Sequence, residues 1–135
     1  MTSTADGASA TPVVLVADDD PDILSLVSLR LKKAGFGVVT AADGEEALRV
    51  VREHRPELAI VDVRMPKMDG LELTRRIRAD DESSEIPVIA LSARVRDANR
   101  AEGFEAGADE YVTKPFSPKQ LVELVQAKLA APTAR

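Results

Sequence analysis

The stretch of sequence that decides the predicted fold is LAIVDVRMPKMDG, residues 58–70. Its first four residues form an apolar run between Pro56 and Pro66, a pattern that predicts a short buried β-strand. The strand ends with Asp62. Because open α/β sheets bind ligands at the carboxyl ends of their strands, we expect Asp62 at a sheet rim, where a carboxylate can act as a nucleophile or a metal ligand.

Strand and helix patterns alternate along the rest of the chain. Apolar runs predict four further strands, at Val13–Val16, Gly37–Ala41, Pro87–Leu91 and Glu110–Thr113. Apolar residues at three- and four-residue spacing predict five helices, at 21–34, 44–54, 70–79, about 96–106 and 118–129. The fourth of these helices carries little apolar bulk and should be weakly anchored. Strands that alternate with helices predict an α/β fold, with five parallel strands flanked by five helices.

Composition and charge argue against several classes of protein. The 135 residues, 44% of them hydrophobic, suit one domain with one core. We expect that domain over residues 13–131, between a disordered tail at 1–12 and a frayed end at 132–135. A net charge of −5 argues against a nucleic-acid-binding module. The lack of cysteine excludes a disulfide framework and fits a cytoplasmic protein, and no apolar run is long enough to span a membrane.

Polar residues follow four of the predicted strands, and in a parallel sheet they would converge on one rim. They are Asp18 and Asp19, Asp62, Ser92, and Lys114. Three carboxylates brought together repel one another unless a cation neutralises them. Oxygen ligands and a phosphate substrate favour Mg²⁺. The sequence therefore predicts phosphoryl transfer to Asp62, with Lys114 and Ser92 as partners of the phosphate oxygens.

Each of these residues also has an ordinary interpretation when it is taken alone. Asp62 could cap its loop, Asp18 and Asp19 could form a solvated turn, Ser92 could be a turn residue and Lys114 a surface lysine. Asp20 and Asp22 suit a helix cap and its first turn. An EF-hand is excluded, because Ile23 and Leu29 stand where a calcium loop needs Gly and Glu. His54 suits a helix end.

Four motifs together resemble the receiver domain of bacterial two-component response regulators. They are LVADDDP at 15–21, IVDVRMP at 60–66 with DG at 69–70, VIALSA at 88–93, and YVTKPF at 111–116. The resemblance covers about residues 13–130. It implies a chemotaxis-regulator-like fold, a flavodoxin-like (βα)5 arrangement with strand order 2-1-3-4-5.

The resemblance also implies a role for each motif residue. Asp62 would be the phospho-acceptor. Mg²⁺, with Mn²⁺ as a possible substitute, would be held by the carboxylates of Asp18, Asp19 and Asp62 and by the backbone carbonyl of Arg64. Lys114 and Ser92 would contact the phosphoryl group, Ser92 and Tyr111 would act as switch residues, and the Lys114–Pro115 peptide would be cis. We further hypothesise that Arg64 and Arg94 tune the lifetime of the phosphoryl group.

By the same resemblance, the protein takes a phosphoryl group from the phosphohistidine of a sensor histidine kinase or phosphotransfer protein. The face built from 96–106, 110–113 and 118–129 would then switch for an unknown downstream effector. Such a protein is a signalling switch that assists its own phosphorylation and autodephosphorylation, not a turnover enzyme. We expect no direct contact with nucleic acid or membrane.

Dimerisation and two rival functions stay open. The protein is expected to be a monomer or a weak, phosphorylation-dependent dimer. Arg100, Asp109 and Glu110 suit the ion pairs of a known dimer type, but Leu124 replaces the arginine of that type. One rival is a haloacid-dehalogenase-like phosphohydrolase, although Asp22 stands where that family has Thr or Val. The other is a docking scaffold with an inert site.

Overall fold

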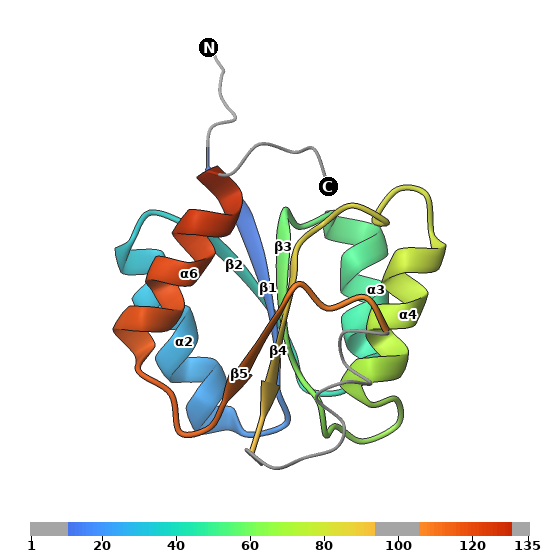
Figure 1. The fold of residues 1–135 in the computed structure, drawn as a ribbon, viewed down its shortest axis with the longest axis horizontal. Helices are drawn as coiled ribbons and strands as arrows, with labels where there is room; N and C mark the ends of the chain where they lie inside the picture. The colour runs from blue at the N-terminus through green and yellow to red at the C-terminus, as the bar shows by residue number, and fades with distance from the viewer. Residues whose placement is uncertain (1–10, 94–105, 131–135) are drawn as a thin grey trace.

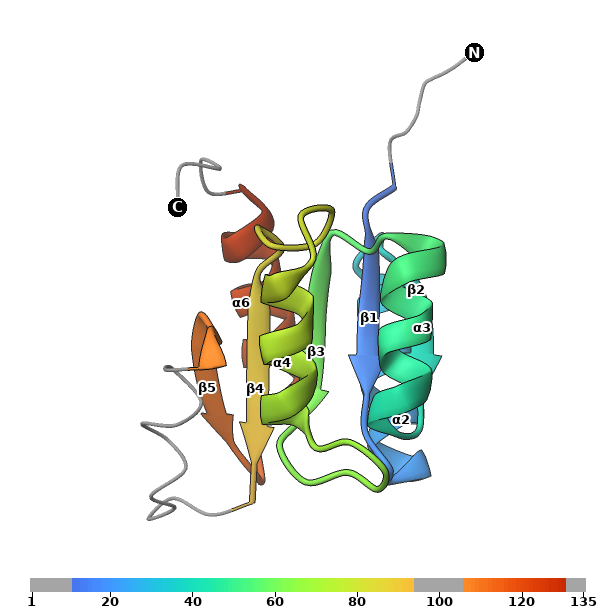
Figure 2. The same cartoon turned by 90° about the vertical axis from the view of Figure 1, so that its right-hand side faces the viewer.

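The fold is a five-stranded parallel sheet between two layers of helices (Figure 1). The computed structural model describes residues 11–93 and 106–130. The strand order is β2-β1-β3-β4-β5, as the resemblance implied. The strands are β1 (Val13–Ala17), β2 (Gly37–Ala41), β3 (Leu58–Asp62), β4 (Val88–Ser92) and β5 (Glu110–Thr113). All four pairings are parallel, so the carboxyl ends of the strands lie at one edge (Figure 2).

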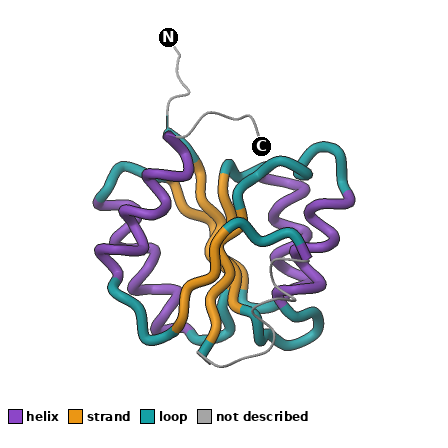
Figure 3. The backbone as a smooth tube through the Cα atoms, in the orientation of Figure 1, coloured by secondary structure: helices purple, strands orange, loops and turns teal. Residues whose placement is uncertain are grey.

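Four helices lie in the described residues, two on each face of the sheet (Figure 3). One face carries α2 (Pro21–Lys33) and α6 (Pro118–Ala130), and the other carries α3 (Gly44–His54) and α4 (Gly70–Ala79). The fifth predicted helix, at about 96–106, lies outside the described residues apart from Ala106. Most of the two predicted tails lies outside them as well. None of the described helices has the length and apolar content needed to cross a membrane.

Apolar residues on both faces of the strands explain why their sequences do not alternate. Along β1, Val14 and Val16 belong to the core cluster beneath α2 and α6, whereas Leu15 and Ala17 belong to the cluster beneath α3 and α4. All four side chains are fully buried. This is the pattern expected of a parallel sheet that is covered on both sides.

Side-chain caps fix where the helices begin, and this determines the position of the loops at the carboxyl rim. Asp20 accepts a hydrogen bond from the backbone N–H of Asp22 at 2.9 Å, and Pro21 takes the first position of α2, as predicted. At the last helix, Ser117 Oγ accepts from the backbone N–H of Gln120 at 3.2 Å. The Lys114–Pro115 peptide that precedes this helix is cis, which confirms that prediction.

Candidate functional site

Three carboxylates meet at the carboxyl rim of the sheet. Asp18 and Asp19 directly follow β1, and Asp62 is the last residue of the neighbouring strand β3. One oxygen from each side chain lies within 4.8 Å of the other two. Asp18 and Asp62 are buried, whereas Asp19 is exposed. The predicted acid cluster is therefore present as a compact group that is open to solvent on one side.

Lys114 supplies a positive charge to this group. Its ammonium donates to Asp18 Oδ2 at 2.9 Å and lies 3.6 Å from Asp62 Oδ2. Its position depends on the sheet, because the backbone N–H of Lys114 donates to the carbonyl of Ser92 at 2.6 Å, just beyond the paired ends of β4 and β5. One lysine against three carboxylates leaves a net negative charge, which would favour the binding of a cation.

The electrostatics of Asp62 reflect this imbalance. Burial, followed by the negative charge of Asp18, raises the pKa of the Asp62 carboxyl from 3.8 to about 6, although Lys114 opposes the shift. For Lys114, burial acts to lower the pKa, but its hydrogen bond to Asp18 and the charge of Asp62 raise it overall. The lysine is thus held in its charged form, and the acid at the centre of the site is costly to ionise without a further cation.

Backbone groups orient the two buried acids. The N–H of Asp20 donates to Asp18 Oδ1 at 2.9 Å, and the N–H of Arg64 lies 3.3 Å from Asp62 Oδ1. Gly70 is a positioning residue that was missed in the sequence analysis. Its N–H donates to the carbonyl of Val63 at 2.9 Å, and a Cβ at this position would collide with the carbonyl oxygen of Asp62. The Asp-Gly pair after the loop is the sequence signal that could have identified it.

The two predicted switch residues lie on adjacent strands. Ser92 ends β4 and is buried, and its strand neighbour Leu91 is aligned with Asp62. Tyr111 on β5 is aligned with Ala90 and is buried in the core cluster beneath α3 and α4. The structure therefore places both residues toward the carboxyl rim of the sheet, while their switching roles stay predictions. Arg94, the second predicted lifetime residue, lies outside the described residues.

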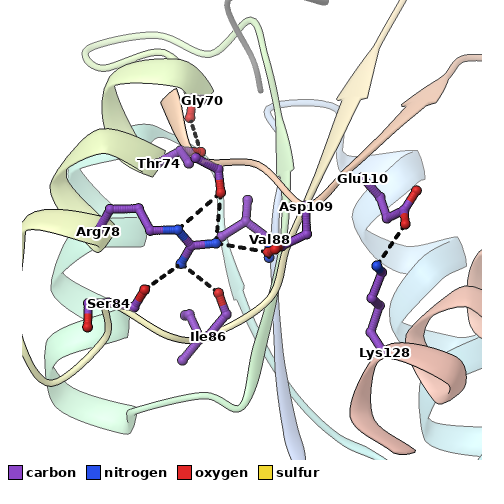
Figure 4. A network of polar contacts seen from close by, with 10 residues as sticks. Gly70, Thr74, Arg78, Ser84, Ile86, Val88, Asp109, Glu110 and Lys128 are labelled. Atoms are coloured by element: carbon purple, nitrogen blue, oxygen red, sulfur yellow. Dashed lines mark hydrogen bonds and ion pairs between the residues drawn. The ribbon is translucent and has the colours of Figure 1, made fainter. Parts of the chain in front are cut away.

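The acids predicted for dimer ion pairs form contacts within the chain. Asp109 Oδ2 accepts from Arg78 Nη2 at 2.8 Å and from the N–H of Val88 at 2.8 Å (Figure 4). Glu110 pairs with Lys128 at 2.7 Å. Arg100 lies outside the described residues, and the dimer prediction is untested. Both acids therefore form ion pairs within the single chain.

The fold and the rim define a class of small α/β protein with an acid cluster and a lysine at the switch-point edge of its sheet. Residues 14–126 match the family model described as the response regulator receiver domain. Because this match covers most of the sequence, the chain belongs to the response regulator receiver domain family.

Relatives and solved structures agree with that assignment. The transcriptional regulatory protein PrrA of Mycobacterium tuberculosis is 44% identical over 124 residues, which cover 92% of this chain and 52% of PrrA. PhoP of Bacillus subtilis, an alkaline phosphatase synthesis regulator, is 37% identical, with 90% of this chain and 52% of PhoP covered. The chain thus spans about half the length of these relatives.

Among solved structures, the chemotaxis response regulator CheY4 of Vibrio cholerae matches with a TM-score of 0.83 and 35% identity, over 87% of this chain and 98% of CheY4. The receiver domain of the Pseudomonas aeruginosa histidine kinase PA1611 matches with a TM-score of 0.84 and 30% identity, over 90% of this chain and all of that one. It carries a magnesium ion in its active-site cleft.

Proposed function

We propose that this protein is a phospho-accepting receiver whose acceptor is Asp62, and that it takes its phosphoryl group from the phosphohistidine of a histidine kinase or a phosphotransfer protein. The observation that carries the proposal is the contact of Lys114 with both Asp18 and Asp62 at the carboxyl rim. A carboxylate at the centre of the rim, a fixed cation and two further acids together suit the transfer of a phosphoryl group.

The donor set fits a hard divalent cation. Asp18, Asp19 and Asp62 would hold Mg²⁺, or Mn²⁺ in its place, and the backbone carbonyl of Arg64 would complete the protein ligands. The net negative charge of the cluster supports this assignment, because a divalent cation would offset it. When bound, such an ion neutralises charge on the oxygens of the transferred group.

The transfer would form one bond and break another. An oxygen of the Asp62 carboxylate attacks phosphorus, and the phosphorus–nitrogen bond of the donor phosphohistidine breaks, so that the electron pair remains on the imidazole. Lys114 offsets negative charge on the transferring oxygens, and the Ser92 hydroxyl donates a hydrogen bond to one of them. The product is an acyl phosphate on Asp62.

The new phosphate adds about −1.5 to −2 charge at neutral pH. Ser92 and Tyr111 are the residues that would report this change to the face that includes β5 and α6. The protein would therefore act as a cytoplasmic signalling switch that assists its own phosphorylation and autodephosphorylation, not as an enzyme with steady turnover. Its downstream effector would read the altered face.

Incubation with Mg²⁺ and acetyl phosphate or phosphoramidate tests the proposed acceptor. We expect intact mass spectrometry to show one added phosphoryl group on the wild-type chain and none on Asp62→Asn. Asp81→Asn, which alters an exposed loop acid away from the site, should be phosphorylated like wild type. Continuous release of phosphate from an ester would instead favour the phosphohydrolase. Partner binding that ignores both Asp62→Asn and the phosphodonor would favour the inert scaffold.

Arg64 provides a second prediction for the same site. Its backbone N–H lies 3.3 Å from Asp62 Oδ1, and the residue is exposed. We expect Arg64→Ala to shorten the half-life of the acyl phosphate, because a smaller side chain admits water more freely. The decay of phosphorylated protein, followed by intact mass after removal of the donor, measures this half-life. Equal half-lives for the variant and wild type would refute a lifetime role for Arg64.

A further inference from the structure

A cavity of about 450 Å³ lies at the opposite rim of the sheet from Asp62. It is bounded by the end of α3, the segment from Asp80 to Pro87, and the end of α6. Two of its lining residues, Pro56 and Pro87, lie just before β3 and β4. Asp62 and Ser92 are at the other ends of these two strands. The volume falls within the range of about 300–1,000 Å³ that small-molecule sites occupy.

The lining of this cavity combines apolar surface with an acidic rim. The apolar residues include Val51, Pro56, Ile86 and Leu129. The charged residues are Glu57, Asp80, Asp81, Glu82 and Glu85, against Arg52, Arg55 and Lys128. The rim therefore carries two more acids than bases.

Each basic residue of the rim already has an acidic partner. Arg52 lies 3.8 Å from Asp80, and Arg55 pairs with Glu82 at 3.0 Å. Lys128 pairs with Glu110, which lies outside the cavity (Figure 4). Within residues 11–93 and 106–130, Glu57, Asp81 and Glu85 form no ion pair. The charge left at the rim is therefore negative, and a positive group would complement it.

The wall of the cavity is held in place before any ligand arrives. Arg78 Nη1 donates to the carbonyls of Ser84 at 3.2 Å and Ile86 at 2.6 Å, and Ser83 Oγ donates to the carbonyl of Ile77 at 2.7 Å. These bonds fix the segment that carries Asp81 and Glu85. A preformed site loses less conformational entropy when it binds a ligand.

We propose that this cavity is a binding site for a small organic cation with an apolar body. The apolar part of the ligand packs on Val51, Ile86 and Leu129, and its ammonium group lies toward Glu57 and Glu85. The excess of acids disfavours carboxylates and phosphates in the same cavity. The site is separate from the acid cluster at the other rim, and binding requires neither Mg²⁺ nor phosphorylation.

Three probes of similar shape test the proposal on the full, unphosphorylated chain without Mg²⁺. They are phenethylamine, phenethyl alcohol and hydrocinnamate, which are cationic, neutral and anionic at neutral pH. Titrations followed by amide chemical shifts in NMR should give the tightest binding for phenethylamine and the weakest for hydrocinnamate. The shifts should centre on Ile86 and Leu129.

Matched variants test whether binding depends on the acids that line the cavity or only on the overall charge of the protein. We expect Glu85→Gln and Glu57→Gln each to weaken phenethylamine binding by about two- to fivefold, the range of exposed ion pairs. Glu53→Gln removes an exposed acid of α3 that does not line the cavity and should leave the affinity unchanged. Glu85→Lys should narrow or reverse the preference over hydrocinnamate.

Several outcomes would overturn the proposal. They are equal affinity for phenethylamine and phenethyl alcohol, shifts centred on residues away from the cavity, no saturable binding at millimolar phenethylamine, and shifts that follow protein concentration instead of probe. The last result would mean that a second copy of the chain covers the cavity. Because none of these measurements involves phosphoryl transfer, they leave the proposed receiver function independently testable.

Discussion

Replacing Arg78 by alanine should lower the free energy of unfolding by about 3–5 kcal/mol, because it breaks a mostly buried ion pair together with several hydrogen bonds to backbone carbonyls. The Arg78 guanidinium donates to the carbonyls of Ser84, Ile86 and Gly107 and to Asp109. The side chains of Arg78 and Asp109 are only 18% and 20% exposed. Without the guanidinium, these acceptors would be left partly buried and without this donor, although Asp109 would still accept from the N–H of Val88.

The expected loss of stability is large because Arg78 connects two separate segments of the chain to α4. One side chain on α4 holds the segment before β4 and the segment before β5 at the same point (Figure 4). A loss of about 3–5 kcal/mol is a large part of the about 5–15 kcal/mol that stabilises a typical domain. Arg78→Lys should restore only part of it, since an ammonium cannot reproduce the planar fork of donors.

Urea unfolding measures the effect, and α4 offers a control of the same residue type. Arg75→Ala removes an arginine whose pair with Glu72 is 3.5 Å long and whose side chain is 52% exposed. That variant should lose less than about 1 kcal/mol. Gly107→Ala tests the contact from the other side, because Gly107 has a φ of +113° and an added Cβ would lie 2.7 Å from Arg78 Cγ. Similar losses for Arg75→Ala and Arg78→Ala would contradict the proposed role of the network.

The acid cluster could be predicted from sequence, and Arg78 shows why the network could not. Strand ends are visible as apolar runs, and a parallel sheet brings their ends together whatever the details of packing. As predicted, the ammonium of Lys114 therefore lies against the carboxylates of Asp18 and Asp62. Most of the groups that accept from Arg78 are backbone carbonyls, which no side-chain pattern reveals, and some belong to residues about thirty positions away.

Close backbone contacts were equally hidden in the sequence. In the sequence, Gly70 begins a predicted helix and belongs to the DG motif, but neither feature indicates the close approach of its backbone to the backbone of Asp62 that the structure shows. Gly44, at the start of α3, meets the backbone of Met68 from the same loop. These contacts depend on how two loops cross in space. The contacts hold the loop close to Asp62, and the spacing of residues along the chain does not reveal such an approach.

Replacing Asp62 by asparagine should stabilise the metal-free protein at neutral pH by up to about 3 kcal/mol. Burial and the neighbouring Asp18 raise the pKa of Asp62 from 3.8 to about 6. Between these two values the folded protein holds a proton that the unfolded chain has released. The contribution of Asp62 to stability is therefore complete below about pH 4 and is lost as the pH rises through about 6.

The pH dependence distinguishes this electrostatic effect from a change in packing. Urea unfolding in EDTA should give Asp62→Asn a gain over wild type at pH 7 and little gain at pH 4, because pH 4 lies close to the unfolded pKa of 3.8, where the unfolded chain also holds about half a proton at Asp62. Asp81→Asn, on an exposed loop, serves as the control and should change stability little at either pH. A gain of equal size at both pH values would show that burial of the charge is not its cause.

Saturating Mg²⁺ should reverse the order of the two proteins. A cation that binds the folded state alone adds stability in proportion to the logarithm of its concentration over its dissociation constant. Wild type offers the carboxylates of Asp18, Asp19 and Asp62, whereas Asp62→Asn lacks one of these three. The variant should therefore gain less from Mg²⁺ and lose its advantage. If Mg²⁺ stabilised both proteins equally, Asp62 would not be a ligand, and the charge it buries would need another explanation.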